Sequence, residues 1–306
     1  MADKVLVTGG AGFIGSHVVD ALHREGYEVV VIDNLVTGSR DNVNPEVPIM
    51  EADLREPGLA RIFQDHKPRF VCHLAAQASI TKSIRGPLLD ADENIMGSLN
   101  VLEQCRNNDV EKIVFASSGG AIYGEPVSLP CDENHPVRPL APYGAAKAAV
   151  EIYLPIYRSL YGLKYTALRY SNVYGPRQNP GGEAGVVAIF ASRMLSKKRV
   201  TINGTGDQER DFVYVQDVAR ANVICLGSGD DDAFNLGSGV GTSVNEIFGH
   251  LNRLTGNSLS PQYRTLSEGE VFKIVLNTEK ARRVLGWDPT VSLEEGLSRT
   301  VDSFRS

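Results

Sequence analysis

The sequence predicts an α/β fold in which helices cover both faces of a doubly wound parallel sheet. Short apolar, β-branched runs alternate with stretches of helical periodicity from residue 1 to about residue 170. A glycine-rich turn joins the first apolar run directly to the first helical stretch. After about residue 171 the alternation breaks, because Gly, Pro and Asn cluster in residues 172–185. Residues 171–306 are therefore expected to form mainly a smaller region that binds substrate.

The alternation places each element of the first region. Strands are expected near residues 4–8, 28–33, 48–51, 69–74, 111–117 and 164–169, and helices near 12–25, 58–66, 87–107 and 143–161. In the second region, the sequence predicts a turn at 203–206 and helices near 186–197, 243–255, 278–285 and 293–304. Late sheet elements near 211–236 are expected to interleave it with the first region. Since no linker separates the two regions, we expect one body around a cleft.

The first turn has the composition of a dinucleotide-binding loop. Gly9, Gly12 and Gly15 follow the strand that ends at Thr8. Glycines there allow a tight turn, a close approach of the backbone to a pyrophosphate, and packing of the helix on the strand. The second strand ends at Asp33, at about the 20-residue distance of the acid that binds the adenine ribose 2′-hydroxyl. Because a carboxylate repels a 2′-phosphate, residues 1–170 are predicted to form a Rossmann-type domain that binds NAD.

Tyr143 and Lys147 lie four residues apart in an expected helix, so their side chains share one face. A free phenol has a pKa of about 10, and a cation about 4 Å away contributes about 4 kcal/mol at an effective dielectric of about 20. Together with a cationic nicotinamide ring, Lys147 is expected to lower the pKa of Tyr143 by about two or three units. Tyr143 is then a candidate base. The same spacing also occurs on amphipathic helices where a half-buried Tyr and a solvated Lys have no chemical role.

Composition excludes several classes of protein. Of 306 residues, 42% are hydrophobic and 22% charged, as in ordinary globular proteins. The net charge of −6, without a basic block, argues against nucleic acid as a partner. The amino terminus enters a strand at once and no apolar run approaches about 18 residues, so we expect no signal peptide, no membrane span and a cytoplasmic location. Four scattered Cys and six His show no CxxC or HExxH spacing, which predicts reduced thiols and no metal.

Eight motifs follow one another along the chain: TGGAGFIGS from Thr8, DNL from Asp33, Asp53-Leu54, HLAAQAS from His73, SSGGAIYG from Ser117, YGAAK from Tyr143, RYSNVYGPRQ from Arg169 and GTGDQERDFVYVQD from Gly204. With them the chain resembles the extended short-chain dehydrogenase/reductase family over nearly its whole length, most closely the UDP-glucose 4-epimerases. The resemblance implies an isomerase that interconverts UDP-glucose and UDP-galactose at C4. Bound NAD⁺ would take a hydride from C4 while Tyr143 removes the 4-hydroxyl proton, and a transient 4-keto sugar would turn over and receive the hydride on its other face.

The resemblance also implies which residues bind the cofactor. These are Gly9, Gly12, Phe13, Ile14 and Gly15 at the pyrophosphate, Asp33 and Asn34 at the ribose, Asp53 and Leu54 at the adenine, and Ala75, Ala76, Gln77, Asn94, Tyr143 and Lys147 at the nicotinamide half. Asn172 and Arg210 would hold the diphosphate of the sugar nucleotide. For Asp53, a helix N-cap before Leu54 is an equal alternative. For Arg210, the alternative is a surface arginine paired with Asp211 or Glu209.

The sequence departs from the epimerase pattern at two places. Gly119 stands four residues before Tyr123, where a Ser or Thr hydroxyl is usual, so we expect Ser118, or else Ser117, to hydrogen-bond the sugar O4. Both serines have the alternative of merely ending a strand. Ser267 stands where an RxGE stretch has its Arg, and Arg264 is the candidate substitute.

The residues before Tyr123 distinguish epimerisation from elimination. Related dehydratases and decarboxylases place Asp or Glu there, whereas this chain has Gly120, Ala121 and Ile122, which transfer no protons. We therefore expect an epimerase. The alternatives are a 4-epimerase of another UDP-sugar, such as an N-acetylhexosamine or a uronate, and a non-catalytic NAD-binding redox sensor.

A homodimer is expected through the helices near 87–107 and 143–161. These two helices carry more apolar residues than they need to pack on one face of the sheet. The residues are Leu99, Val101, Leu102, Ala149, Ile152 and Tyr153. The alternative to a dimer is that these six residues form an apolar stripe that is buried wholly against the sheet of the same chain.

Overall fold

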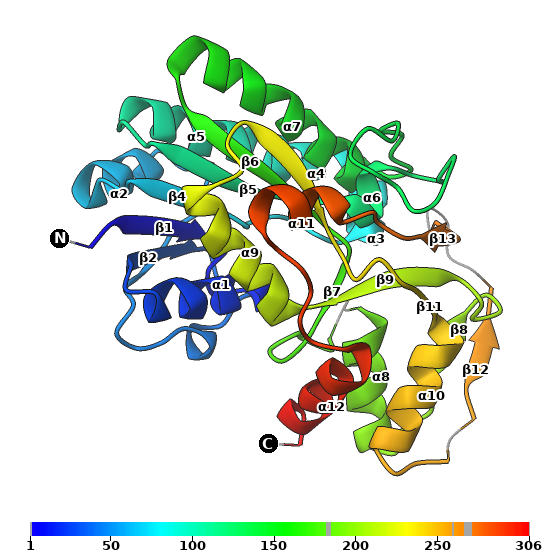
Figure 1. The fold of residues 1–306 in the computed structure, drawn as a ribbon. Helices are drawn as coiled ribbons and strands as arrows, with labels where there is room; N and C mark the ends of the chain where they lie inside the picture. Colours follow the sequence, from blue (N-terminus) through cyan, green and yellow to red (C-terminus); the bar gives the residue numbers. More distant parts are fainter. Residues whose placement is uncertain (1, 182–184, 259, 266–270, 306) are drawn as a thin grey trace.

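The computed structural model describes residues 2–181, 185–258, 260–265 and 271–305. Its centre is a parallel sheet of seven strands in the order β10-β6-β5-β4-β1-β2-β3 (Figure 1). The strands are β1 (Lys4–Thr8), β2 (Glu28–Asp33), β3 (Ile49–Glu51), β4 (Phe70–His73), β5 (Lys112–Ser118), β6 (Lys164–Tyr170) and β10 (Asp232–Leu236). The chain leaves β1 toward β3 on one side and returns to β4 on the other. Ligands bind at such a switch point, beyond the carboxyl ends of the strands.

Helices cover both faces of this sheet (Figure 1). Val5 and Val7 of β1 enter one core with α1 (Phe13–Arg24), whereas Leu6 enters the other with α2 (Gly58–His66), α5 (Gly97–Asn107) and α7 (Pro142–Tyr161). Successive strand residues point to opposite faces, so a strand buried on both faces must be apolar throughout. The predicted doubly wound α/β class is confirmed.

The structure differs from the prediction over residues 211–236. Only β10 joins the main sheet. β9 (Glu209–Tyr214) belongs to a second sheet, and residues 215–227 form a helix, α9 (Val215–Gly227), that packs on the same face of the main sheet as α1. The buried face of α9 includes Asp217 and Asn222, whose side chains are satisfied by hydrogen bonds to Thr290 and Tyr170. Because polar residues occupy buried positions of α9, apolar residues do not recur there at the spacing from which a helix is predicted.

The residues after β6 also build two small sheets. β7 (Asn172–Tyr174), β9, β11 (Gly241–Ser243) and β13 (Lys273–Ile274) form one, and β8 (Thr201–Asn203) pairs with β12 (Gln262–Arg264). The helices α8 (Val186–Leu195), α10 (Val244–Leu254) and α12 (Leu293–Ser303) enclose a separate core there (Figure 1). α11 (Glu279–Leu285) instead packs against the core that contains α1 and α9. These four helices match the expected ones closely.

The single helix expected over 87–107 is interrupted. After α3 (Ile80–Arg85) come α4 (Pro87–Ala91), a π-helical turn η2 (Asp92–Met96) and then α5. Such π turns insert a residue into a helix and are frequent at functional sites. Two shorter elements, η1 (Arg40–Asn42) and α6 (Gly119–Ile122), complete the described fold. No described helix is long and apolar enough to cross a membrane.

The apolar stripe considered for a homodimer divides between core and surface. Val101 and Leu102 of α5 are buried on the sheet, contrary to the expectation that they contribute to an exposed stripe. Ile152 of α7 is 66% exposed, and Leu88 of α4 and Leu160 of α7 are exposed as well. The outward apolar surface is therefore formed by α4 and α7.

Candidate active site

The glycine turn lies between β1 and the amino terminus of α1, at the carboxyl edge of the sheet. Gly9 has a φ of +70°, and a Cβ there would lie 2.6 Å from the amide nitrogen of Ala75. A Cβ at Gly15 would overlap the carbonyl oxygen of Gly9. Both positions therefore require glycine, and the turn that they form leads into the amino terminus of α1, the end of a helix that favours an anion. Phe13 and Ile14 are the first two residues of that helix.

Asp33 ends β2 beside this turn and is buried. Its Oδ2 accepts a hydrogen bond from the Ala11 amide at 2.9 Å, and its Oδ1 accepts one from the Leu35 amide at 2.8 Å. The carboxylate thus ties the glycine turn to the end of β2. Each oxygen keeps a second lone pair with which it can accept a ribose hydroxyl.

Asp53 forms a local carboxylate–guanidinium pair. Its two oxygens accept from Arg55 Nε and NH2 at 2.9 and 2.6 Å, and this pairing lowers the pKa of Asp53 to about 2. The alternative that Asp53 caps a helix is wrong, because α2 begins only at Gly58. Asn34 is exposed and hydrogen-bonds the Asp53 side chain, which brings the expected ribose and adenine residues together, with Leu54 adjacent.

The loop after β4 is locked to η2 by paired amides. The Ala75 amide donates to Thr8 Oγ1 at 3.2 Å. Two residues further on, the Gln77 amide donates to Asn94 Oδ1 at 2.8 Å, and Asn94 Nδ2 donates back to the Gln77 carbonyl at 2.9 Å. Both side-chain amides also donate to Asp90, which sequence reasoning missed. The available signal was the four-residue spacing of Asp90 and Asn94 on one expected helix.

Tyr143 and Lys147 lie in the first two turns of α7, and both face inward. The Tyr143 hydroxyl forms a hydrogen bond with the Ser118 side chain. Lys147 is 4% exposed, so the alternative of a solvated lysine end is wrong. Its Nζ donates to the Ala116 carbonyl at 2.8 Å and lies 5.9 Å from the centre of the Tyr143 ring.

Burial moves the pKa values of this pair toward their neutral forms. Desolvation raises the pKa of Tyr143 to about 12, against the opposing effect of the Ser118 hydrogen bond. Desolvation lowers the pKa of Lys147 to about 8, against the attraction of Asp90 and Glu151. The protein's own groups therefore do not lower the pKa of Tyr143. The expected fall requires the positive charge of a cofactor ring as well.

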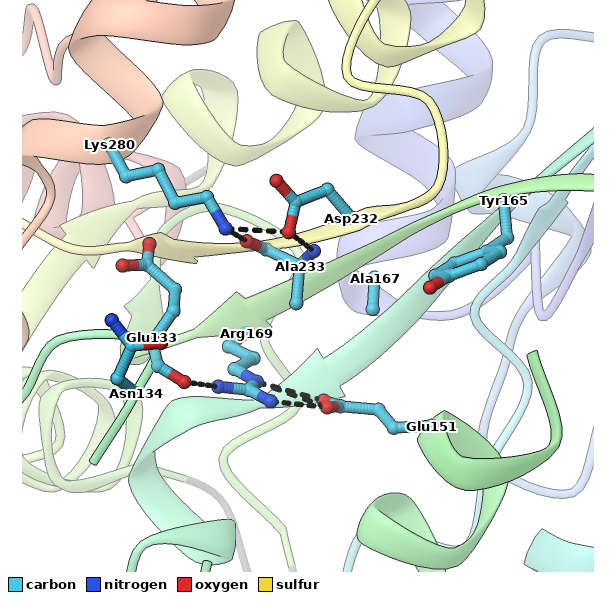
Figure 2. Close-up of a pocket in the computed structure, with 9 residues that line it drawn as sticks. All are labelled: Glu133, Asn134, Glu151, Tyr165, Ala167, Arg169, Asp232, Ala233 and Lys280. Atoms are coloured by element: carbon cyan, nitrogen blue, oxygen red, sulfur yellow. Dashed lines mark hydrogen bonds and ion pairs between the residues drawn. The ribbon is translucent and has the colours of Figure 1, made fainter. Parts of the chain in front are cut away.

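The two candidate serines point to different places because they are neighbours in β5. Ser118 reaches Tyr143, whereas Ser117 Oγ donates to Glu151 at 2.5 Å. Glu151 forms an ion pair with the buried Arg169 at 2.6 Å. This pair lines a polar cavity of about 260 Å³ between α7, β6 and β10. Figure 2 shows the pair there, with Arg169 also donating to the Glu133 carbonyl.

Gly119 has a steric reason to lack a side chain. A Cβ there would lie 2.6 Å from Leu276 Cδ1 and 3.2 Å from the Arg169 carbonyl oxygen. A side chain with the hydroxyl that is usual at this position would require Leu276 to shift, and Ser118 supplies a hydroxyl one residue earlier.

The expected diphosphate residues lie on paired strands of the second sheet. Asn172 in β7 stands opposite Phe212 in β9, two residues beyond Arg210. Asn172 Oδ1 would be 3.6 Å from a Cβ at Gly120, so it reaches α6, which directly follows Ser118. Arg210 NH1 donates to the carbonyls of Glu209 and Phe272 at 3.0 Å.

The carboxylates considered as partners of Arg210 are engaged elsewhere. Glu209 pairs with Lys273 at 2.7 Å, and the buried Asp211 accepts from Ser238, Gly239 and Leu276. Arg264 is exposed on β12 and donates to Asn203 at 2.6 Å, while Ser267 lies outside the described residues.

Comparison with known proteins decides the family. The profile of the NAD dependent epimerase/dehydratase family matches residues 5–237. The chain belongs to this family. It is 48% identical to a putative UDP-glucose 4-epimerase of Methanocaldococcus jannaschii, over 99% of this chain and 98% of that protein.

Two solved structures of similar proteins carry the relevant ligands. The UDP-glucose 4-epimerase of Thermotoga maritima with UDP-glucose has a TM-score of 0.97 and 51% identity, covering 99% of this chain and 98% of that one. The UDP-glucose 4-epimerase of Thermus thermophilus in complex with NAD has a TM-score of 0.94 and 47% identity, covering 99% of each chain. The resemblance to the extended short-chain dehydrogenase/reductases and the expectation of NAD are confirmed. The glycine turn and the carboxylate of Asp33 fit this cofactor, because only glycines fit the turn and Asp33 has lone pairs for a ribose.

Proposed function

We propose that this member of the epimerase/dehydratase family is a NAD-dependent UDP-sugar 4-epimerase that interconverts UDP-glucose and UDP-galactose. One observation carries the proposal. The inward-facing Tyr143 is hydrogen-bonded to Ser118 and lies one turn from the buried Lys147. Ser118 ends β5 at the same carboxyl edge of the sheet as the dinucleotide loop, and residues 120–122 offer no second acid–base group. Epimerisation needs one group that removes and returns a single proton, whereas elimination needs a further acid or base.

The roles follow from the positions of the side chains. NAD, when bound, accepts and returns the C4 hydride, and its cationic ring favours the phenolate form of Tyr143. Tyr143 takes the proton of the 4-hydroxyl and later gives it back to the same oxygen. Ser118 hydrogen-bonds that oxygen, and Lys147 contributes a positive charge next to the phenolate. Asn172 and Arg210, on neighbouring strands, bind the diphosphate.

The cofactor residues are assigned in the same way. We place Gly9, Gly12, Phe13, Ile14 and Gly15 at the pyrophosphate and Asp33 with Asn34 at the adenine ribose. Asp53 and Leu54 lie at the adenine, and Ala75, Ala76, Gln77 and Asn94 at the nicotinamide half. The paired amides of Gln77 and Asn94 support this placement, because they fix the loop that follows β4 at the edge of the sheet.

The test is product analysis with purified protein and no added NAD. Incubation with UDP-galactose is expected to yield UDP-glucose, and the reverse, with NAD released on denaturation and identified by mass spectrometry. The same assay with UDP-N-acetylglucosamine and UDP-glucuronate checks the alternative substrates. Bound NAD without turnover of any sugar nucleotide would favour the redox-sensing alternative and refute the proposed activity.

We further propose a homodimer in the cytoplasm. The exposed apolar side chains of α4 and α7 offer a surface for a second copy of the chain. All four cysteines are free and buried, which suits a reducing compartment. Light scattering is expected to give twice the mass of the chain, and Ile152→Glu together with Leu160→Glu to give a monomer. Val284→Glu on α11 is the control, and a wild-type monomer at micromolar concentration would contradict the dimer.

A further inference from the structure

Asp90 is a buried carboxylate that the roles assigned above do not use. It lies on α4 and is 2% exposed. Its Oδ1 accepts from Gln77 Nε2 at 2.9 Å and from Asn94 Nδ2 at 3.0 Å. Its Oδ2 is buried and has no hydrogen-bond partner among the described residues. A half-satisfied buried carboxylate costs folding free energy, so its presence beside a reaction site indicates a role in the chemistry.

The hydrogen bonds of Asp90 reach the nicotinamide half of the proposed site. Gln77 and Asn94 already pair through their backbone and side-chain amides, and Asp90 accepts from the remaining N–H of each side chain. One carboxylate oxygen therefore fixes the loop after β4 against η2. Without it, both amides would lose a charge-assisted acceptor.

The charge of Asp90 also acts on the catalytic pair. Among the described residues, three titratable groups act on Lys147 through their charge: Asp90 from α4, Glu151 from α7 and His73 from β4. The Lys147 ammonium also lies over the rings of Phe115 and Tyr143. Burial lowers the pKa of His73 to about 3, so this ring is neutral at neutral pH. Glu151 is already paired with Arg169 at 2.6 Å. Asp90 is therefore the carboxylate near Lys147 whose charge no cation pair neutralises in the described part of the chain.

We propose that Asp90 is a positioning residue for epimerisation, which holds Gln77 and Asn94 in place and keeps Lys147 in its ammonium form beside Tyr143. This inference rests on the proposed function, because the charge of Lys147 matters only if Tyr143 transfers the proton. Since burial lowers the pKa of Lys147 to about 8 even with Asp90 present, loss of this carboxylate would lower this pKa further and reduce the fraction of Lys147 that is protonated at neutral pH.

Asp90→Asn tests the charge while it keeps the shape and one acceptor oxygen. Removing a negative charge disfavours the ammonium of Lys147 and favours the phenolate of Tyr143, so both pKa values fall together. Activity needs Tyr143 as the phenolate, so protonation of Tyr143 limits the rate at low pH. It also needs Lys147 as the ammonium, so deprotonation of Lys147 limits the rate at high pH. Both limbs of the kcat/KM profile are therefore expected to move to lower pH by about one unit, which is the effect of one charge several ångströms away. A purely structural role would lower the rate without moving the limbs.

Two further variants separate charge from folding. Asp90→Glu retains the charge and is expected to keep both limbs at wild-type pH, even if the rate falls. Asp65→Asn, an exposed carboxylate change on α2, is the matched control and should leave the profile unchanged. If the limbs of Asp90→Asn coincide with those of Asp90→Glu and the wild type, the proposal is overturned.

A measurement without substrate separates this inference from the proposed function. The ionisation of Tyr143 in the NAD-bound protein is followed by phenolate absorbance, as the difference between each protein and its Tyr143→Phe counterpart. In Asp90→Asn the pKa of Tyr143 is expected to fall by about one unit. That shift in a protein that epimerises no sugar nucleotide would support the role of Asp90 and refute the proposed activity. An unmoved titration in an active enzyme would refute the role of Asp90 alone.

Discussion

At the scale of single residues, one hydroxyl has no substitute in the site. We propose Tyr143 as the group that exchanges the 4-hydroxyl proton, and its hydroxyl forms a hydrogen bond with the Ser118 side chain. Tyr143→Phe keeps the ring and its packing but removes the acid–base group. We expect kcat to fall at least a hundredfold, within the range of about 10² to 10⁴ for general acid–base groups, with NAD still bound. Assays of turnover and of cofactor content check this, and full activity would remove Tyr143 from the mechanism.

The two serines give a second, paired prediction. Ser118→Ala removes the partner of Tyr143 and is expected to lower kcat by about ten- to a hundredfold, the cost of roughly one strong hydrogen bond to a reacting oxygen. Ser117→Ala removes only a donor to Glu151, which keeps Arg169, so kcat should change less than about threefold. Steady-state kinetics of both variants decides between them. The reverse ranking would place Ser117 at the sugar.

Lys147 makes stability depend on pH. Its pKa is about 8 in the folded protein and 10.5 when unperturbed, so between these values the unfolded chain binds the extra proton. Stability therefore rises with pH across this window, by up to about 3 kcal/mol from this residue. Buried cysteines with raised pKa values lower the stability of both proteins at high pH. In urea unfolding from pH 7 to 10, the free energy of unfolding of the wild type should therefore rise relative to that of Lys147→Met. Parallel curves for the two proteins would mean that Lys147 has an ordinary pKa.

At the scale of elements, Leu276 packs closely on the amino terminus of α6, where the chain turns directly from β5 into this helix. Gly119→Ser would bring a Cβ to within 2.6 Å of Leu276 Cδ1. We expect a loss of about 1–3 kcal/mol in the free energy of unfolding, as for other overpacked sites. Gly58→Ala is the control, because no atom lies within 4 Å of a Cβ there. Urea titrations compare the two, and an unchanged or raised stability of Gly119→Ser would show that Leu276 moves aside.

At the scale of the whole molecule, segments from both halves of the sequence share one core. Val218 and Leu226 of α9, Phe234 of β10 and Trp287 pack with the residues of α1 and β1. Trp287 Nε1 also donates to the Asp217 carbonyl at 2.8 Å.

A fragment of residues 1–170 tests this interleaving. It lacks α9 and β10 and would expose to water the part of the sheet face that α9 covers beside α1, so it should unfold without a cooperative transition. The full chain should show one transition in which circular dichroism and the fluorescence of Trp287, its single tryptophan, coincide. A cooperative transition in the fragment would instead make residues 1–170 an independent domain.

The sequence alone determined the features that depend on neighbours in the chain. The glycine turn, Asp33 at the end of β2 and the inward face shared by Tyr143 and Lys147 follow from local backbone geometry, which short spacings specify. The regular helices and strands of the first region follow for the same reason, because their periodicity records which face is buried.

Only the tertiary structure decided the features that depend on distances between remote segments. Ser118 and Ser117 are equivalent in a sequence, and Tyr143 and Glu151 distinguish them only when α7 packs on β5. The helix α9 was hidden because its buried polar residues find partners in distant segments. Asp90 became part of the site only when α4, η2 and the loop after β4 came together. Such contacts join residues far apart along the chain, and no local spacing encodes them.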